Sequence, residues 1–330
     1  MKAIEISQPG GPDVLRLCER PEPSVGPHDV LIRVAAASVN RPDVQQRKGL
    51  YDPPPGASDI PGLDTAGIVE RVGAAVERIR PGDRVCALST GGGYAELCAV
   101  PQGQVMPVPA GLSLTEAATL PEVFFTAWHN VFQLSRLERN EALLIQGGTS
   151  GVGLAATQMA RVLRHARVFA TAGSAEKCSV SEAYGAQCVD YHDPAWGQAL
   201  RDLAGERGFD VILDSQAGDY VDIEVGLLAI GGRLALIGNH RGEYSTLRTR
   251  SFVQRSLTLT GAQIRRRDTA FKQKIANELV QYVWPELAQR RIRTLVQAAF
   301  PLEQAAAAQQ ILDDNQQMGK VVLIVDRAIA

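Results

Sequence analysis

A glycine-rich turn at residues 147–153 offers the clearest chemistry in this sequence of 330 residues. The apolar run ALLIQ before it has the length of a buried strand, and an alanine-rich helical pattern follows it at once. Gly148, Ser150 and Gly153 occupy the three small-residue positions of a G-x-G-x-x-G pattern. Small residues there permit a sharp turn, a close approach to a pyrophosphate and tight packing of helix on strand. The turn predicts a dinucleotide site, with a flexible turn that binds nothing as the alternative.

The next strand supports the dinucleotide interpretation. RVFAT (167–171) lies about 20 residues beyond the glycines, where a dinucleotide fold meets the adenosine ribose. An NAD-selective site places an acid at the end of that strand, but this chain has Thr171-Ala172-Gly173-Ser174, with Lys177 just beyond. A hydroxyl and an ammonium suit a 2′-phosphate, so the sequence favours NADPH over NADH. The alternative for Lys177 is an ordinary solvated helix lysine.

Composition narrows the class of protein. The chain is 45% hydrophobic, which suits two domains, and its net charge of −2 gives no footprint for nucleic acid or an anionic membrane. It has no uninterrupted apolar run of membrane-spanning length, and its amino terminus lacks the apolar core of a signal peptide. Five scattered cysteines are expected to be reduced thiols. We expect a soluble, cytoplasmic protein.

The order of the patterns predicts two domains of the α/β class. Short strands broken by Gly and Pro fill the chain to about residue 108 and suggest a β-rich, barrel-like domain. A long helical stretch is expected from 114 to 134, and six strands alternating with helices then predict a doubly wound Rossmann domain with a six-stranded parallel sheet. The last strand, GKVVLIVD, is expected to return to the first domain. The predicted domains are 1–121 with 266–330, and 122–265.

Two loops of the predicted parallel sheet should face the dinucleotide. Residues 214–218 follow the strand DVILD, and Gly238 and Asn239 follow RLALI. Ligands of open α/β sheets bind beyond the carboxyl ends of the strands. Ser215, Gly238 and Asn239 are therefore expected near the cofactor.

Several spaced motifs resemble one known family across essentially the whole chain. SVNRPDVQQRKGLYDPPPG, PGLDTAGIVERVG, PGDRV, GGTSGVG and a closing GKVVL occur in order. Together they resemble the zinc-free quinone oxidoreductase branch of the medium-chain dehydrogenase/reductase superfamily, to which zeta-crystallin belongs. YDPPPGAS, PGGP and TAGS bring the sequence closest to the tumour-suppressor-induced NADPH quinone oxidoreductase type. The resemblance implies a GroES-like catalytic domain beside the Rossmann domain.

Zinc-dependent members of that superfamily use a Cys, a His in a G-H-E motif and a later Cys or acid as catalytic ligands. This chain has Asn40 at the first position and Gly62-Leu63-Asp64 at the second. The four-cysteine loop of a structural zinc is missing, and the five histidines have no ligand spacing. We therefore expect no metal.

The resemblance also assigns site residues. It implies pyrophosphate contacts for Ser150, Gly151 and Val152, and a 2′-phosphate pocket of Gly173, Ser174, Lys177 and Tyr191, although Tyr191 could equally be a packing residue. Asn40, Thr126 and Gly238 are expected near the nicotinamide. Tyr51, which precedes three prolines, could donate to a quinone oxygen or simply pack, and Gln263 and Arg265 are expected to close over the cofactor, with a surface charge as the alternative for Arg265.

Without a Lewis acid, hydride transfer needs an acceptor that is already electron-poor, such as a quinone. We therefore expect an NADPH-dependent quinone oxidoreductase in which Tyr51 and Asn40 serve catalysis and the substrate is a small molecule. The alternatives are an NADPH-dependent reductase of enones or enoyl double bonds, and a crystallin-like protein that binds NADPH with little turnover. Ser256 to Ala262 should form an open sheet edge through which a homodimer pairs, unless a helix covers it.

Overall fold

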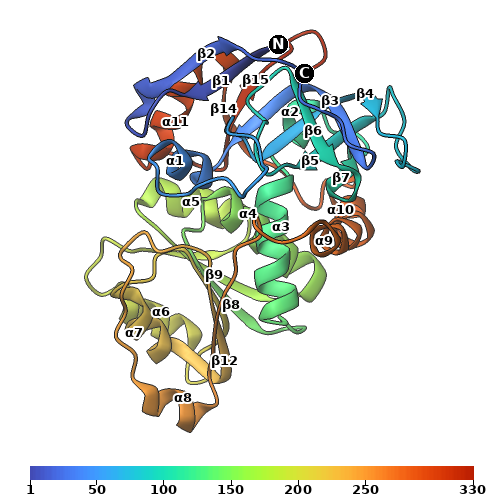
Figure 1. Ribbon diagram of the computed structural model, residues 1–330. Helices are drawn as coiled ribbons and strands as arrows, with labels where there is room; N and C mark the ends of the chain where they lie inside the picture. Colours follow the sequence, from blue (N-terminus) through green and yellow to red (C-terminus); the bar gives the residue numbers. More distant parts are fainter. The chain divides into compact units, whose positions relative to one another are not determined.

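The computed structural model describes all 330 residues, which form two compact units. Unit 1 comprises Met1–Phe125, Ile264–Arg290 and Thr294–Ala330. Unit 2 comprises Thr126–Gln263 and Arg291–Arg293. Figure 1 traces both along the chain. Unit 1 is thus assembled from three separate stretches of sequence.

Unit 2 is built on a parallel sheet of six strands in the order β10-β9-β8-β11-β12-β13. The strands are β8 (Ala142–Gln146), β9 (Arg167–Ala172), β10 (Gln187–Asp190), β11 (Phe209–Asp214), β12 (Leu228–Leu236) and β13 (Thr258–Gly261). The chain enters the sheet at β8, winds outward to β10, then returns to β11 beside β8. This is the doubly wound Rossmann order, and it confirms the fold predicted from the sequence.

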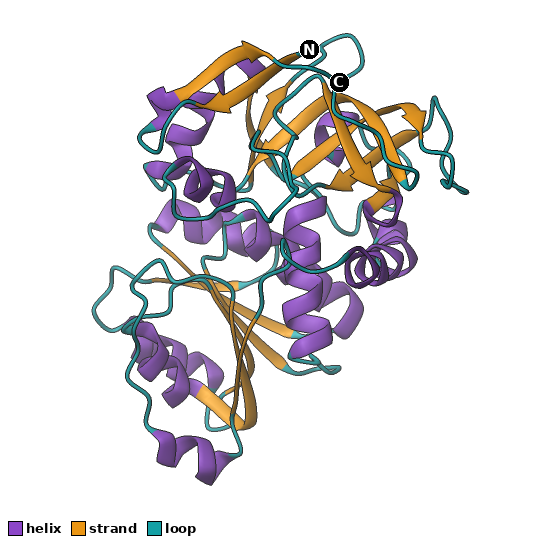
Figure 2. Ribbon diagram, viewed as in Figure 1, coloured by secondary structure: helices purple, strands orange, loops and turns teal.

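Helices connect these strands (Figure 2). They are α4 (Gly151–Arg164), α5 (Ala175–Ala183), α6 (Trp196–Ala204), α7 (Tyr220–Leu227) and α8 (Thr249–Arg255). Apolar side chains of α6 and α7 pack with those of β8, β9 and β11 into one core cluster that includes Trp196, Leu200, Phe169 and Phe209. That core fixes the positions of the strand ends from which the binding loops leave.

Unit 1 contains a seven-stranded, mainly antiparallel sheet and a separate hairpin. The hairpin is β1 (Lys2–Ile6) with β2 (Leu15–Glu19). The larger sheet comprises β3 (Asp29–Val39), β4 (Asp64–Val72), β5 (Arg84–Leu88), β6 (Leu97–Pro101), β7 (Val105–Pro107), β14 (Val296–Pro301) and β15 (Lys320–Ile324). The expected final strand, β15, lies between β14 and β3, parallel to the first and antiparallel to the second.

The remaining helices are short or belong to the returning segment of unit 1. They are α1 (Arg41–Arg47), α2 (Leu114–Ala117), α3 (Pro121–Ala127), α9 (Thr269–Tyr282), α10 (Trp284–Ala288) and α11 (Ala305–Asp313). Single turns of 3₁₀ helix occupy Pro12–Val14, Gln102–Gln104 and Leu302–Gln304, and a π-helix follows α3 at Trp128–Leu134. None of the helices combines the length and apolar composition that crossing a bilayer requires.

The long helix expected from 114 to 134 is wrong as a single element. The chain forms α2, a break, α3 and then the π-helix. Pro121 begins α3; it has no N–H to donate, and its ring would clash with the preceding turn of a continuous helix. The alanine-rich pattern therefore predicted helical structure correctly and its continuity wrongly.

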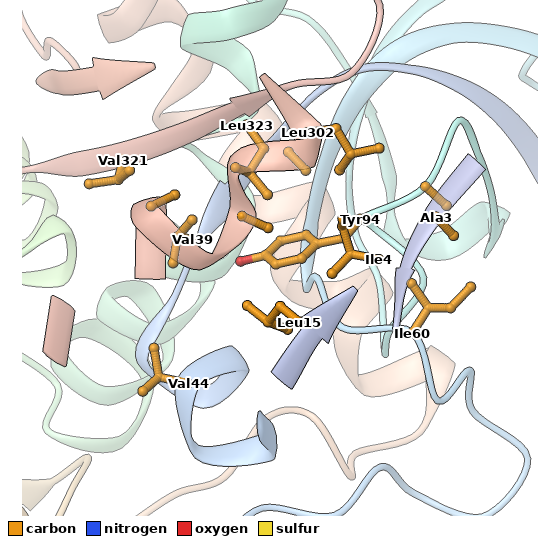
Figure 3. Close-up of a cluster of buried hydrophobic side chains, with 14 of the residues drawn as sticks. Ala3, Ile4, Leu15, Val39, Val44, Ile60, Tyr94, Leu302, Val321 and Leu323 are labelled. Carbon is orange, nitrogen blue, oxygen red and sulfur yellow. The ribbon is translucent and has the colours of Figure 1, made fainter. Parts of the chain in front are cut away.

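A core cluster in unit 1 surrounds Tyr94 (Figure 3). Its fully buried ring lies among side chains of the β1–β2 hairpin, β3 and β15, among them Ile4, Leu15, Val39 and Leu323. The Tyr94 hydroxyl donates a long hydrogen bond of 3.4 Å to Asp43 Oδ2. This core joins the first and last strands of the chain and supports the polar cluster described below.

Candidate active site

The glycine-rich turn ends in a capped helix. Ser150 is the N-cap of α4: its hydroxyl accepts from Gly153 N at 3.0 Å and donates to Gly147 O at 2.8 Å. The N–H groups of Gly151 and Val152 lie in the first turn, where no intrahelical acceptor exists. Donors at the positive end of a helix dipole suit a pyrophosphate.

The structural roles of the glycines in this turn differ from those predicted. The left-handed conformation belongs to Gly147, with φ +84°, whereas Gly148 packs so closely that an added Cβ would lie 2.6 Å from Ala170 Cβ. A Cβ on Gly153 would lie 2.4 Å from Gly147 O. The sharp turn is thus made one residue earlier than predicted, and Gly153 permits the close approach of helix and turn.

A second group of predicted residues gathers where β9 and β10 end. Ser174 is the N-cap of α5 and accepts from Lys177 N at 3.2 Å. A Cβ on Gly173 would lie 2.3 Å from Tyr191 Oη, so the tyrosine hydroxyl lies directly against the glycine backbone. Lys177 is partly buried, and this burial lowers the pKa of its ammonium. These residues form a small polar cluster with a cation at its edge.

His192 also belongs to this polar cluster and was not predicted. Its ring lies 4.6 Å from that of Tyr191, and its Nδ1 is 3.0 Å from Gly173 O. Asp190 lies beside this histidine, and its Oδ1 accepts from His192 N at 2.9 Å. The only signal in the sequence was adjacency to Tyr191, which did not distinguish His192 from a surface histidine.

The two loops after β11 and β12 meet. His240 N donates to Ser215 O at 3.3 Å, and a Cβ on Gly238 would lie 2.7 Å from the same carbonyl oxygen. Asn239 forms a turn in which its own carbonyl accepts from Gly242 N at 3.1 Å. Ser215, Gly238 and Asn239 are therefore brought together at the carboxyl edge of the sheet, as their positions after parallel strands indicated.

A buried carboxyl pair beneath these loops was also missed. Asp214 and Glu224 are both fully buried, and burial raises the pKa of each. Asp214 accepts from the backbone N–H groups of Gln216 at 2.5 Å and Ala217 at 2.7 Å, which favours its ionised form. The charge of Asp214 raises the pKa of Glu224 further, so Glu224 is the member of the pair that binds a proton more readily.

In unit 1, Asn40 belongs to a buried polar cluster. Lys320 Nζ donates to Asn40 Oδ1 at 2.5 Å and lies 3.4 Å from Asp64 Oδ2. That oxygen also accepts from Asn40 Nδ2 at 2.8 Å and Ser38 Oγ at 2.5 Å, while Oδ1 accepts from Glu122 N at 2.6 Å. The amide of Asn40 is therefore held at both ends by a cation and an anion.

Asp43 caps α1 next to this cluster. Its two carboxylate oxygens accept from the backbone N–H groups of Asn40 at 2.9 Å and Gly62 at 3.0 Å. Complete burial nevertheless raises the pKa of Asp43 to about 6, with the charge of Asp64 adding to the rise. The cluster therefore holds one acid that titrates near neutrality.

Tyr51 and Arg265 come together within unit 1. The Arg265 guanidinium carbon lies 5.3 Å from the centroid of the Tyr51 ring, a cation–π distance. Arg265 is only 6% exposed, which removes the surface-charge alternative. Gln263, the last residue of unit 2 before unit 1 resumes, is exposed, and the half-buried Thr126 lies in α3.

The two units define an NAD(P)-type oxidoreductase of the medium-chain class. Residues 26–110 match the alcohol dehydrogenase GroES-like domain, and residues 151–281 match the zinc-binding dehydrogenase domain. The quinone oxidoreductase of Rattus norvegicus is 32% identical over 332 residues, covering 98% of each chain. The chain belongs to the quinone oxidoreductase family of the medium-chain dehydrogenase/reductase superfamily.

Solved structures agree with this assignment. Escherichia coli quinone oxidoreductase complexed with NADPH is 26% identical, with a TM-score of 0.87 and coverage of 98% of this chain and 100% of that one. A mycobacterial protein complexed with NADPH is 30% identical, with a TM-score of 0.88 over 98% and 100% of the two chains. The family resemblance and the fold read from the sequence are confirmed.

Proposed function

We propose that this oxidoreductase transfers hydride from NADPH to a quinone without a metal. The observation that carries the proposal is the ammonium of Lys320 between Asn40 and Asp64. Asn40 stands at the first ligand position of the zinc-dependent pattern, and Asp64 follows Leu63, which stands at the position of the histidine ligand. A fixed cation there would repel a zinc ion, and the Asp64 carboxylate already accepts hydrogen bonds from three further donors. The acceptor must then supply its own electron deficiency, as a quinone does.

NADPH would bind along the carboxyl edge of the parallel sheet. The turn that carries Ser150, Gly151 and Val152 would hold the pyrophosphate, and the pocket of Gly173, Ser174, Lys177 and Tyr191 the 2′-phosphate. The fit rests on the free N–H groups at the N-terminus of α4, which Ser150 caps, and on the partly buried cation at Lys177. When bound, NADPH supplies the hydride; the protein binds, orients and excludes water.

The residues at the end of β9 support a preference for NADPH. Thr171 and Ala172 stand where a ribose-binding acid would be, and Asp190 on the neighbouring strand is engaged by His192. A 2′-phosphate beside Lys177 would offset the desolvation of its ammonium. We therefore propose selectivity for NADPH over NADH.

The test is to follow nicotinamide absorbance with NADPH or NADH and four acceptors: an ortho-quinone, a para-quinone, an enone and a simple aldehyde. The proposal requires quinone turnover with NADPH, poorer turnover with NADH, and no loss after dialysis against a chelator. Preference for the enone would assign the protein to double-bond reduction. Tight NADPH binding without turnover of any acceptor would leave a crystallin-like binding protein.

We further propose a homodimer that acts in the cytoplasm. Five free cysteines with no disulfide suit a reducing compartment. The strand β13 pairs only with β12 and so ends the sheet of unit 2, which supports pairing with a second copy.

A further inference from the structure

Arg265 is a buried cation with an unused donor. Its Nε and Nη2 donate to Thr90 O at 3.0 and 2.8 Å, and Nη2 also donates to Gln46 Oε1 at 2.7 Å. Nη1 is buried and has no hydrogen-bond partner. A buried guanidinium N–H without an acceptor is costly, so a site that keeps one is arranged for a ligand that supplies the acceptor.

The surroundings of Arg265 are short of negative charge. No carboxylate contacts its guanidinium, and Lys272, only 2% exposed, donates to Arg265 O at 2.9 Å. Burial and the Arg265 charge lower the pKa of Lys272 to about 8. Asp43 and Tyr51 act on Arg265 through charge, and Asp268 acts on Lys272, but neither cation forms an ion pair with an acid. Two buried cations therefore lie close together without a paired anion.

The Tyr51 ring gives this donor a flat, aromatic boundary. Tyr51 lies in the irregular segment between α1 and β4, and its ring packs against the guanidinium. A planar acceptor ring can stack in the same manner, because guanidinium and aromatic faces attract one another. Nη1 is the nitrogen of this guanidinium that has no acceptor, and so it remains for the carbonyl oxygen of such a ring.

The geometry points to Arg265 Nη1 as the binding site for the acceptor carbonyl oxygen, where it takes the negative charge that develops during hydride transfer. This inference rests on the proposed quinone reduction and deepens it by placing the acceptor. It assigns Arg265 to the acceptor, whereas the sequence placed it over the cofactor.

The chemistry balances with one proton from water. The hydride delivers two electrons and one proton to the quinone, which leaves a hydroquinone anion whose oxygen accepts from Nη1. Arg265 keeps its own proton, because a guanidinium remains protonated at neutral pH. Water then protonates the anion, so that NADPH, a quinone and one proton give NADP⁺ and a hydroquinone. The donor stabilises the charge as it forms, which is the role of an oxyanion hole.

The experiment uses the full-length protein with NADP⁺ bound and 4-nitrophenol as a probe of oxyanion binding. The absorbance of the phenolate reports the pKa of the bound probe. Wild type should lower that pKa by about one unit or more, because a guanidinium favours the phenolate. Arg265→Gln should abolish the shift and lower kcat/KM for a quinone by about 100-fold. Its NADPH Kd should stay within about twofold of wild type, since the cofactor contacts are untouched.

The matched control is Arg266→Gln, which removes the same charge from the adjacent, exposed arginine and should behave as wild type. Arg265→Lys keeps the charge and should restore part of the probe shift, which also tests the site if the glutamine variant fails to fold. A probe shift that survives in Arg265→Gln, or an NADPH affinity that falls as far as turnover, would overturn the inference.

Different results would refute the role of Arg265 and the proposed function. A probe shift that depends on Arg265 in a protein that reduces no quinone would refute the proposed function and leave the oxyanion site standing. Quinone reduction that is equal in wild type and Arg265→Gln would leave the function standing and refute the role of Arg265.

Discussion

Lys177 is the residue on which the cofactor proposal depends most directly. Lys177→Gln removes the cation at the edge of the predicted 2′-phosphate pocket and retains a side chain of similar length. One charge-assisted hydrogen bond to a phosphate is worth about 2 kcal/mol, so KM for NADPH should rise about 10- to 100-fold. KM for NADH should hardly change, and steady-state assays with both cofactors measure the difference.

Lys274→Gln is the control for that measurement, because Lys274 is exposed on α9. An equal loss with NADPH and NADH would instead assign Lys177 to folding or to the pyrophosphate. That result would remove the support for NADPH selectivity while leaving the glycine-rich turn as a dinucleotide site.

Asp43 makes stability depend on pH in a direction opposite to that of most acids. Its pKa is about 6 in the folded chain against 3.8 for the free side chain, so folding favours the protonated form. This stabilisation is complete below pH 3.8 and is lost as pH rises through 6. Between pH 4.5 and 7.5 it should fall by about 2 kcal/mol.

Urea unfolding of wild type and Asp43→Asn at these two pH values isolates the effect. The variant loses one cap acceptor at both pH values, but it cannot titrate. The stability advantage of wild type should therefore be larger at pH 4.5 than at 7.5. A difference that is constant with pH would show that Asp43 is ionised throughout.

At the scale of elements, the approach of α4 to its turn depends on Gly153. Gly153→Ala places a methyl group 2.4 Å from a backbone carbonyl, which cannot move aside as a side chain can. We expect a loss of about 1–3 kcal/mol in unfolding free energy, with weaker dinucleotide binding. Gly197→Ala on α6 is the matched control: its new methyl group meets only Ile223 Cγ2, at 3.1 Å. Greater helix propensity should keep that variant within about 0.5 kcal/mol of wild type.

The elements themselves were largely readable from the sequence, because their signals are local. Alternating apolar runs and turn residues predicted all six strands of unit 2, and the spacing of glycines located the turn before α4. Two strands of unit 1 were not predicted: β7 has only three residues, and β14 lacks a clear apolar alternation. The break at Pro121 was overlooked because the apolar pattern continues across it.

The site was predictable only where its residues follow strands or fit a motif. Ser215 and Gly238 meet because parallel strands end at one edge. By contrast, Lys320 reaches Asn40 across 280 positions of sequence, and no periodicity reports such a contact. The burial of Glu224 was not predicted, because the sequence pattern of a helix does not show whether a given carboxyl group on it is exposed or buried.

At the scale of the whole molecule, the return of the last strand ties the ends of the chain together. Fully buried Arg47 of α1 hydrogen-bonds with Gln309 at 3.0 Å and Asp313 at 2.5 Å, both of α11. Together with β15 between β14 and β3, this ion pair makes the fold of unit 1 depend on both ends of the sequence. Unit 1 is therefore complete only after the last strand has been synthesised.

The assembly proposal can be tested at the sheet edge. Exposed Thr258 begins β13, whose outer side has no strand partner. Thr258→Lys places a charge on the edge, a device that natural sheets use against pairing, and in a two-fold dimer each new charge is introduced twice. Light scattering coupled to size exclusion should give about twice the chain mass for wild type and a shift toward the monomer for the variant. Thr249→Lys, at an exposed position on α8, controls for the added charge. A wild-type mass of one chain would refute the dimer, and a variant that remains dimeric would move the interface away from β13.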